Sequence, residues 1–260
     1  MRSAPCRSGL LRPLLAAVLV FGLSACAKRP PASDVDATQE YNDNHDPFEP
    51  ANRVSFAVSE GLDTYFLAPV ARAYRYAVPG VVRRPVHNLL TNMTTPVLFI
   101  NDVVQTRPRA AGDTFMRFII NTTVGVGGVF DVASGWGYPF HDNDFGLTLA
   151  LWGVPEGPFL FLPLLGPSNP RDATGYGVDI AFDPFIWTPT GHGLHTLDTV
   201  RTGLSILDTR TNVLDEVDSI KKTALDPYAT FRSLYRQNRQ STIDNIKSED
   251  RATVPNWYAP

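Results

Sequence analysis

The apolar stretches of this chain are short and repeatedly interrupted. The 260 residues include 22 prolines and 19 glycines. After residue 26 no uninterrupted apolar run approaches the ~20 residues that a membrane-spanning helix requires. Proline and glycine both disfavour helix interiors, so the pattern favours many short helices, whereas a water-soluble bundle usually has longer ones. Composition leaves two interpretations open, an irregular globular fold or a flat body whose helices turn their apolar sides to acyl chains within one leaflet.

Spacing predicts a single, mainly α-helical domain over residues 46–240. The first helix is marked by apolar residues three and four apart, namely Ala51, Val54, Val58, Leu62 and Tyr65. Further helices are expected over 69–78, 81–93, 96–106, 109–123, 145–152, 172–182, 195–207, 213–224 and 227–240. One short extended segment is expected near residues 158–163. No internal repeat divides the domain further.

Residues 1–25 are predicted to be a signal peptide. Arg2, Arg7 and Arg12 form a basic beginning, and an apolar stretch follows over residues 14–21. The segment Leu23-Ser24-Ala25-Cys26 resembles the lipobox of bacterial lipoproteins, in which small residues precede a cysteine that accepts lipid. We therefore expect cleavage before Cys26 and lipid attachment to it. The alternative is ordinary signal-peptidase cleavage beside an incidental cysteine.

The chain that remains after cleavage is acidic and has one cysteine. Loss of the three arginines changes the formal net charge from −3 to −6, which argues against a nucleic-acid partner because such partners need a clustered basic face. Cys6 leaves with the signal peptide, so no intramolecular disulfide is expected if Cys26 carries lipid. The polar residues 26–45 are expected to form a flexible tether, and residues 241–260 a loose polar tail.

Four stretches of the sequence resemble the MlaA (VacJ) lipoproteins. The first opens the domain with Asp46, Pro47, Glu49, Asn52 and Arg53, where Asp46 and Glu49 also suit a capping box and Pro47 a first helical position. The second is a glycine-rich segment that contains Arg117, Asn121, Gly125, Gly127, Gly128 and Asp131. The third contains Phe145, Gly146, Gly153, Gly157, Pro158, Pro163, Gly166, Arg171 and Asp172, and the fourth Asp226, Pro227 and Tyr228. They occur in the family's order over nearly all of residues 46–240, which is more specific than any one motif.

The resemblance implies a ring- or doughnut-like body in the inner leaflet of the outer membrane, with a central amphipathic channel for phospholipid. It implies two partners, a trimeric outer-membrane porin and a soluble periplasmic lipid carrier, and no cofactor. A channel or gating region is implied at Asn52, Arg53, Asn121, Gly125, Gly127, Gly128 and Asp131. The remaining motif residues are expected to be structural, with Cys26 as the lipid anchor.

Enzyme and metal sites are weakly supported. Gly125–Gly128 lacks the preceding strand of a phosphate-binding loop. Ser59 and Ser168 stand in imperfect versions of the G-x-S-x-G motif, and His141 beside Asp142 and Asp144 has no nucleophile near it in sequence. His192 and His195 lack further metal ligands, so neither a metal nor a catalytic residue is expected.

Three functions remain from this reasoning. The first is removal of mislocalised phospholipid from the outer leaflet of the outer membrane, with transfer to a periplasmic carrier, which maintains lipid asymmetry. The alternatives are a structural, porin-associated lipoprotein and a lipid hydrolase. The apolar stripe of the 227–240 helix, with Tyr228 and nearby arginines, fits either the core or the membrane interface.

Overall fold

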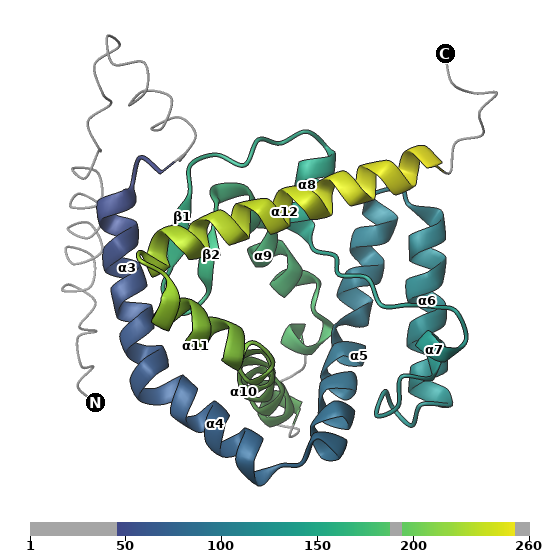
Figure 1. Ribbon diagram of the computed structural model, residues 1–260. Coiled ribbons are helices and arrows are strands. Elements are labelled where there is room, and N and C mark those ends of the chain that lie inside the picture. The colour runs from purple at the N-terminus through teal and green to yellow at the C-terminus, as the bar shows by residue number, and fades with distance from the viewer. Residues whose placement is uncertain (1–45, 188–193, 253–260) are drawn as a thin grey trace, which may run out of the picture.

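The computed structural model describes residues 46–187 and 194–252. The predicted signal peptide, Cys26 and the tether therefore lie outside the described residues, as do His192 and the last eight positions. The described chain is mainly helical, as expected, with one small pair of strands (Figure 1). No helix among the described residues is long and apolar enough to cross a membrane.

A nearly continuous helical arm opens the fold. Helix α3 (Glu49–Leu62) passes through the single π-helical stretch η1 (Asp63–Leu67) into α4 (Ala68–Ala77). We predicted a boundary before Pro69, because proline cannot donate the backbone hydrogen bond to the residue four positions earlier. The chain instead widens by one π turn just before this proline and remains helical, which is how such a helix accommodates a missing donor.

The next two helices form an antiparallel pair. Helix α5 (Gly80–Val104) runs through Pro85 and Pro96, so the prediction of two helices, 81–93 and 96–106, was wrong. The side chains of Val97 and Leu98, just after the second proline, are buried, so tertiary packing compensates for the lost hydrogen bond. Helix α6 (Pro108–Thr123) confirms the prediction for 109–123.

Short elements fill the middle of the chain. Helix α7 (Val132–Gly135) is followed by α8 (Phe145–Leu151), which ends before Gly153 at a positive φ of 86°. The extended segment predicted near 158–163 is confirmed as β1 (Leu160–Leu162). It pairs antiparallel with β2 (Gly166–Ser168), with Leu160 opposite Ser168. Helix α9 (Pro170–Phe182) and the 3₁₀ turn η2 (Pro184–Trp187) complete this part.

Three helices end the described chain, namely α10 (Leu194–Asn212), α11 (Leu214–Thr223) and α12 (Pro227–Ala252). The loose tail predicted from residue 241 was wrong as far as Ala252, because α12 continues through it. Ile243 and Ile246 on this extension are buried against Leu147 and Ala150 of α8. These two apolar residues, four-fifths hidden in a polar sequence by their neighbours' composition, are enough to dock the last turns.

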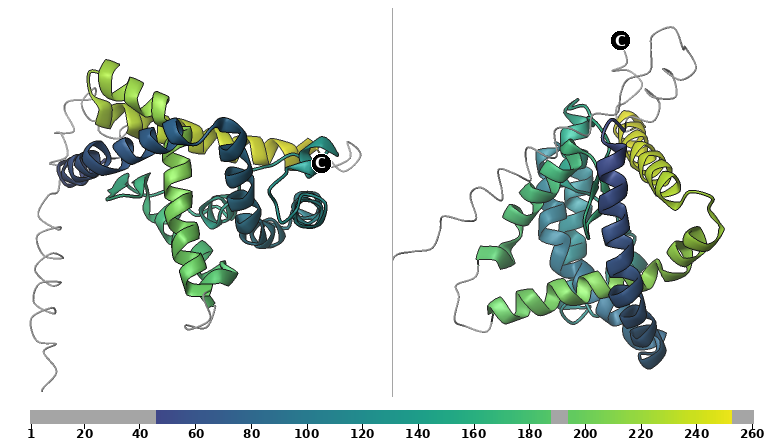
Figure 2. Two further views of the ribbon diagram at one scale, coloured as in Figure 1. Left: turned by 90° about the horizontal axis from the view of Figure 1, so that it is seen from below. Right: turned by 90° about the vertical axis from the view of Figure 1, so that its left-hand side faces the viewer.

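The elements are arranged as a ring. Figure 1 shows α3 and α4 along one side, α5 along the other and α12 across the top, with α11 and the end of α10 between them. Figure 2 shows α10 and the end of α9 projecting from one side of this ring. The apolar cores are small, and one of them gathers Phe159, Phe161 and Tyr228 beneath Phe56 of α3.

Candidate functional site

The polarity of the body is partly inverted. Buried polar and charged side chains are at least as numerous among the described residues as buried apolar ones, and Asn101, Asp102 and Thr148 are completely enclosed. Large apolar side chains are exposed on nearly every element, with Tyr65 87% and Tyr76 95% exposed. A water-soluble protein usually buries such groups and leaves polar ones outside. We call these exposed apolar side chains the apolar rim.

The first motif forms a clamp between the two ends of the domain. Asn52 donates to Asp46 Oδ1 at 2.7 Å and to the carbonyl of Phe159 at 3.0 Å, and it accepts from the amide of Phe161 at 3.0 Å. The other oxygen of Asp46 accepts from the Tyr228 hydroxyl and, at 2.9 Å, from Arg232. This use of its carboxylate shows that the predicted capping role of Asp46 was wrong, since α3 begins with no side-chain cap.

Arg53 strengthens the same clamp from its outer side. Its guanidinium lies 2.6 Å from Asp226 Oδ2 and 2.8 Å from Glu49 Oε1, and 4.5 Å above the ring of Tyr228. The hydrogen bond from Arg53 lowers the pKa of Asp226. Glu49 thus binds Arg53 and not the start of its helix, as a capping box would require. Asn52 and Arg53 therefore join α3 to β1 and to the start of α12.

The second motif makes a tight turn against α5. Gly127 and Gly128 have positive φ angles of 73° and 98°. A Cβ added to Gly128 would lie 2.4 Å from the Cβ of Asn92, and one added to Gly125 would lie 2.3 Å from the carbonyl oxygen of Phe130. Asn92 also donates to the carbonyl of Gly127 at 3.3 Å. Glycine is therefore required here by close backbone approach as well as by conformation.

Asp131 collects polar contacts at the end of this turn. It accepts from Asn121 at 3.0 Å and from the Ser134 hydroxyl at 2.6 Å, and Arg117 Nη2 lies 2.9 Å away. Burial opposes ionisation, but the hydrogen bonds from Ser134, Arg117 and Asn121 outweigh it and lower the pKa of Asp131 to about 2. These groups line one wall of a small polar cavity of about 100 Å³ between α5 and α6.

A buried polar network that the sequence did not reveal lies between α5 and α8. The carboxylate of Asp102 accepts from Thr114 at 2.5 Å and from Asn143 at 2.7 Å, and His141 Nε2 lies 3.0 Å away. Gln105 extends the network to Thr148 at 2.8 Å. The available signal was the polar stripe of Asn101, Asp102 and Gln105 inside an otherwise apolar stretch.

The third motif joins α8, α9 and α12. Arg239 holds Asp144 through two contacts of 2.6 and 2.7 Å and lies 2.9 Å from Asp172 Oδ2. Asp172 also accepts from the hydroxyl of Tyr235. Burial opposes ionisation, yet Arg171, Tyr235 and Arg239 together lower the pKa of Asp172. Gly146 allows this approach, because a Cβ there would lie 2.5 Å from the Arg239 guanidinium.

The other residues of the third motif shape turns. Gly153, Gly157 and Gly166 have positive φ angles of 86°, 74° and 89°. Pro158 and Pro163 flank the first strand. Phe145 begins α8, and its amide donates to Asp179 Oδ2 at 3.0 Å. Pro227 opens α12. Thus the structure brings the motif residues into three clusters, one at each end of α12 and one beneath the glycine turn.

The weak enzyme motifs do not assemble into a catalytic arrangement. Ser59 donates to the carbonyl of Ser55 at 3.0 Å, and Ser168 is buried. His141 Nε2 faces both Asp102 and Thr114, whereas a triad needs its two ring nitrogens to meet different partners. Within the described residues no group of three His, Cys, Asp or Glu side chains is arranged to hold a metal. The side chain of His195 lies outside that part of the chain.

Comparison with known proteins points in one direction. The family model described as MlaA lipoprotein matches residues 44–242. The intermembrane phospholipid transport system lipoprotein MlaA of Haemophilus influenzae is 33% identical over 242 residues, which is 92% of this chain and 95% of that protein. The protein of the same description from Escherichia coli K12 is 33% identical over 199 residues, covering 74% and 76%. An uncharacterised protein of Rickettsia bellii is 36% identical over 205 residues, covering 78% and 79%.

A solved structure has the same fold. It comes from work on the structural basis for maintenance of bacterial outer membrane lipid asymmetry, and it matches with a TM-score of 0.66 and 29% identity. The match covers 76% of this chain and 98% of the solved one.

Proposed function

The chain belongs to the MlaA lipoprotein family, and from this premise we propose that it removes mislocalised phospholipid from the outer leaflet of the outer membrane. The lipid passes through an amphipathic channel in the ring to a soluble periplasmic carrier, which maintains lipid asymmetry. The described relatives are lipid-transport lipoproteins, and we propose that this chain, like them, acts without catalysis.

The inverted polarity is the observation that carries the proposal. Each large apolar side chain on the rim costs ~1.5–3 kcal/mol when it is left in water, and acyl chains remove that cost. A charged head group needs the opposite environment, because crossing hydrocarbon without partners costs several kcal/mol. A body with apolar side chains outside and Asn, Gln, Asp and Arg inside supports both requirements at once. A structural role alone needs no such interior.

The candidate residues take two kinds of role in this proposal. The clamp around Asn52 and Arg53 keeps the ring closed where α3 meets α12, and so controls the width of the opening. Asn121, Asp131 and the turn at Gly125, Gly127 and Gly128 provide a polar wall that is already satisfied internally. Such a wall lets a head group pass without holding it, because few of its donors are left to bind phosphate tightly.

Location and partners complete the proposal. Acylation of Cys26 anchors the chain to the periplasmic face of the outer membrane, and residues 26–45 tether the ring to that anchor. A trimeric porin is the proposed membrane partner, and the soluble carrier is the proposed acceptor. Replacing Cys26 with serine should leave the chain unprocessed or mislocalised on membrane fractionation. Correct placement and full activity of that variant would remove the anchor from the proposal.

The main test compares outer-leaflet phospholipid in cells with and without this protein. Deletion should raise phospholipid in the outer leaflet, and expression of the intact chain should restore the low level. A structural lipoprotein that only clamps a porin would leave asymmetry intact after deletion. For the hydrolase alternative, the purified protein should release no fatty acid from phospholipid vesicles, and clear turnover would contradict a transport role without catalysis.

A further inference from the structure

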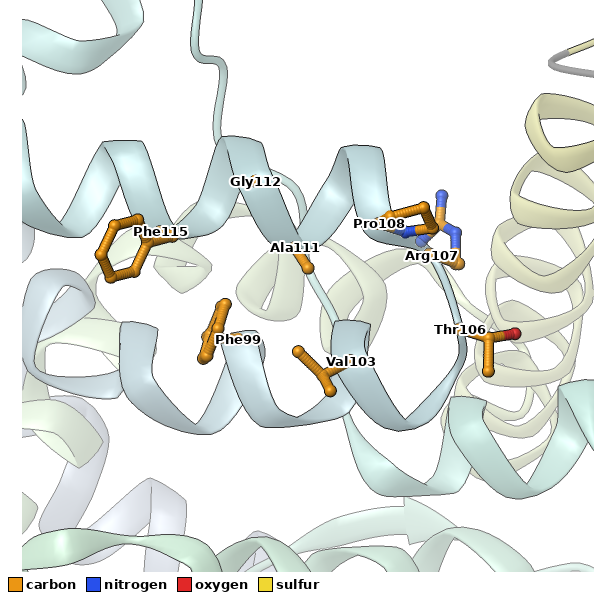
Figure 3. Close-up of a pocket in the computed structure, with 8 residues that line it drawn as sticks. All are labelled: Phe99, Val103, Thr106, Arg107, Pro108, Ala111, Gly112 and Phe115. Atoms are coloured by element: carbon orange, nitrogen blue, oxygen red, sulfur yellow. The ribbon is translucent and has the colours of Figure 1, made fainter.

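A groove between α5 and α6 opens on the apolar rim. It has a volume of about 680 Å³, and Figure 3 shows its lining on the facing sides of the two helices. Phe99 and Val103 come from α5, and Ala111 and Phe115 from α6. Ligand pockets for small molecules commonly measure ~300–1,000 Å³ and are mostly apolar, with a few polar groups that fix orientation. The groove has both properties.

The two ends of the groove differ in chemistry. Phe99 and Phe115 meet at one end, with ring centroids 5.8 Å apart, and about half of the Phe115 side chain is exposed. Thr106 and Arg107 lie at the other end (Figure 3). The eight residues of α6 between Arg107 and Phe115 place the ends ~12 Å apart at 1.5 Å per residue. A guest in this groove would therefore be elongated, apolar along its length and polar at one end.

The polar end is able to receive an anion. Arg107 is 9% exposed, and its Nη2 donates at 2.9 Å to Glu249 of α12, whose side chain is 69% exposed. An ion pair with so exposed a carboxylate contributes little, ~0–1 kcal/mol, so a phosphate oxygen can replace it at small cost. Arg107 forks toward planar anions better than lysine would. The side chain is therefore oriented for an anionic group at the mouth.

Gly112 leaves the wall of the groove open. A Cβ added there would meet no heavy atom within 4 Å, so this glycine is not required by packing. Glycine inside a helix costs ~1 kcal/mol relative to alanine. In the middle of α6, facing the groove, it keeps free a space that any side chain would begin to fill (Figure 3).

We propose that this groove binds one acyl chain of a membrane phospholipid, with the phosphate at Arg107 and the methyl end at Phe99 and Phe115. The inference depends on the proposed function only in placing the rim in lipid. The groove is continuous with Met116 and Ile119 on the same helix, both exposed. A chain that enters it leaves bulk lipid without crossing water. The groove thus holds lipid on the outside of the ring, separate from the passage through its interior.

The test uses the full chain in vesicles of phosphatidylethanolamine and phosphatidylglycerol. One phosphatidylethanolamine carries a photoactivatable diazirine near the end of an acyl chain, and labelled peptides are mapped after irradiation. We expect label concentrated on α5 and α6 around Phe99 and Phe115. A second lipid, with its diazirine close to the glycerol, should move the label toward Thr106 and Arg107.

The decisive variant is Gly112→Leu, with Gly203→Leu on α10 as its matched control. Both glycines are helical and have no heavy atom within 4 Å of an added Cβ, so each leucine fits without displacing protein. Each methylene displaced from the groove lowers occupancy about fourfold, so displacing two lowers the α5 and α6 label by about fifteenfold. The control should leave that label unchanged.

Two results would overturn the inference. Label spread evenly along the rim and insensitive to Gly112→Leu would mean that the groove is not a distinct site. A groove free of label on an otherwise labelled rim would mean that polypeptide covers it. The deletion test of lipid asymmetry fails or succeeds independently of both. Groove labelling without an asymmetry defect would refute the transport proposal alone, and the reverse result would refute the groove alone.

Discussion

Arg239 offers the sharpest test of how the ring is held together. Its guanidinium bridges Asp144 of α8 and Asp172 of α9, and replacing it with methionine keeps the length of the side chain while removing the charge. Breaking a buried ion pair from one side costs ~3–5 kcal/mol, because a charge is left without its partner. Asp144 is 35% exposed and can turn to water, while Asp172 is 9% exposed but keeps Arg171 at 2.9 Å. We therefore expect the lower value, ~3 kcal/mol.

The assay is thermal unfolding of the detergent-solubilised protein, followed by circular dichroism. For a chain of this size each kcal/mol shifts Tm by ~2–4 °C, so Arg239→Met should lower Tm by ~6–12 °C. Arg239→Lys should fall between, because one ammonium cannot span two carboxylates as a guanidinium does. The matched control is Arg236→Met, which removes a half-exposed pair with Glu156 at 3.0 Å and should cost ~1 kcal/mol or less. Equal shifts for Arg239→Met and Arg236→Met would refute the assignment of Arg239 as the central link.

Three further predictions use the same unfolding measurement. Gly128→Ala should destabilise more than Gly127→Ala, because both positions have positive φ but only Gly128 faces an atom 2.4 Å from an added Cβ; equal losses would show that the turn can shift away from Asn92. Asp131→Asn should be less stable than the natural chain at neutral pH. Since the folded pKa of Asp131 is lowered to about 2, its ionised form stabilises the fold above the ordinary pKa of ~3.9, and the gap should close as pH falls from about 4 to about 2. A gap that stays constant over this range would contradict that reasoning. Ile246→Ala should cost ~2–5 kcal/mol, as for other buried isoleucines, whereas a loose tail would make it neutral.

Local signals predicted the local structure well. Helix α6 follows from one apolar stripe and a preceding proline, and the end of α8 follows from Gly153, because both depend on residues close in sequence. The break expected at Pro96 was wrong because burial of Val97 and Leu98 decides the outcome. The last turns of α12 were missed for a similar reason. Only contact with α8 gives Ile243 and Ile246 their weight.

The candidate site was predictable as a set of residues but not as an arrangement. Motif resemblance selected Asn52, yet its partners Phe159 and Phe161 lie more than a hundred positions away. Spacing cannot supply such pairings. The network around Asp102 was missed altogether, since each of its members looks like an ordinary polar interruption when the sequence is scanned one helix at a time.

The link between Asp46 and Arg232 has a consequence for the order of assembly. The two residues are separated by 186 positions, so the carboxylate at the start of the domain finds its partners only after α12 has been exported. Contacts of such long range form late and slowly. Until then the N-terminal arm carries a charge with no mate and an uncovered greasy flank. The newly secreted chain is therefore most vulnerable to aggregation before its final helix arrives, and a holdase in the periplasm would act on that interval.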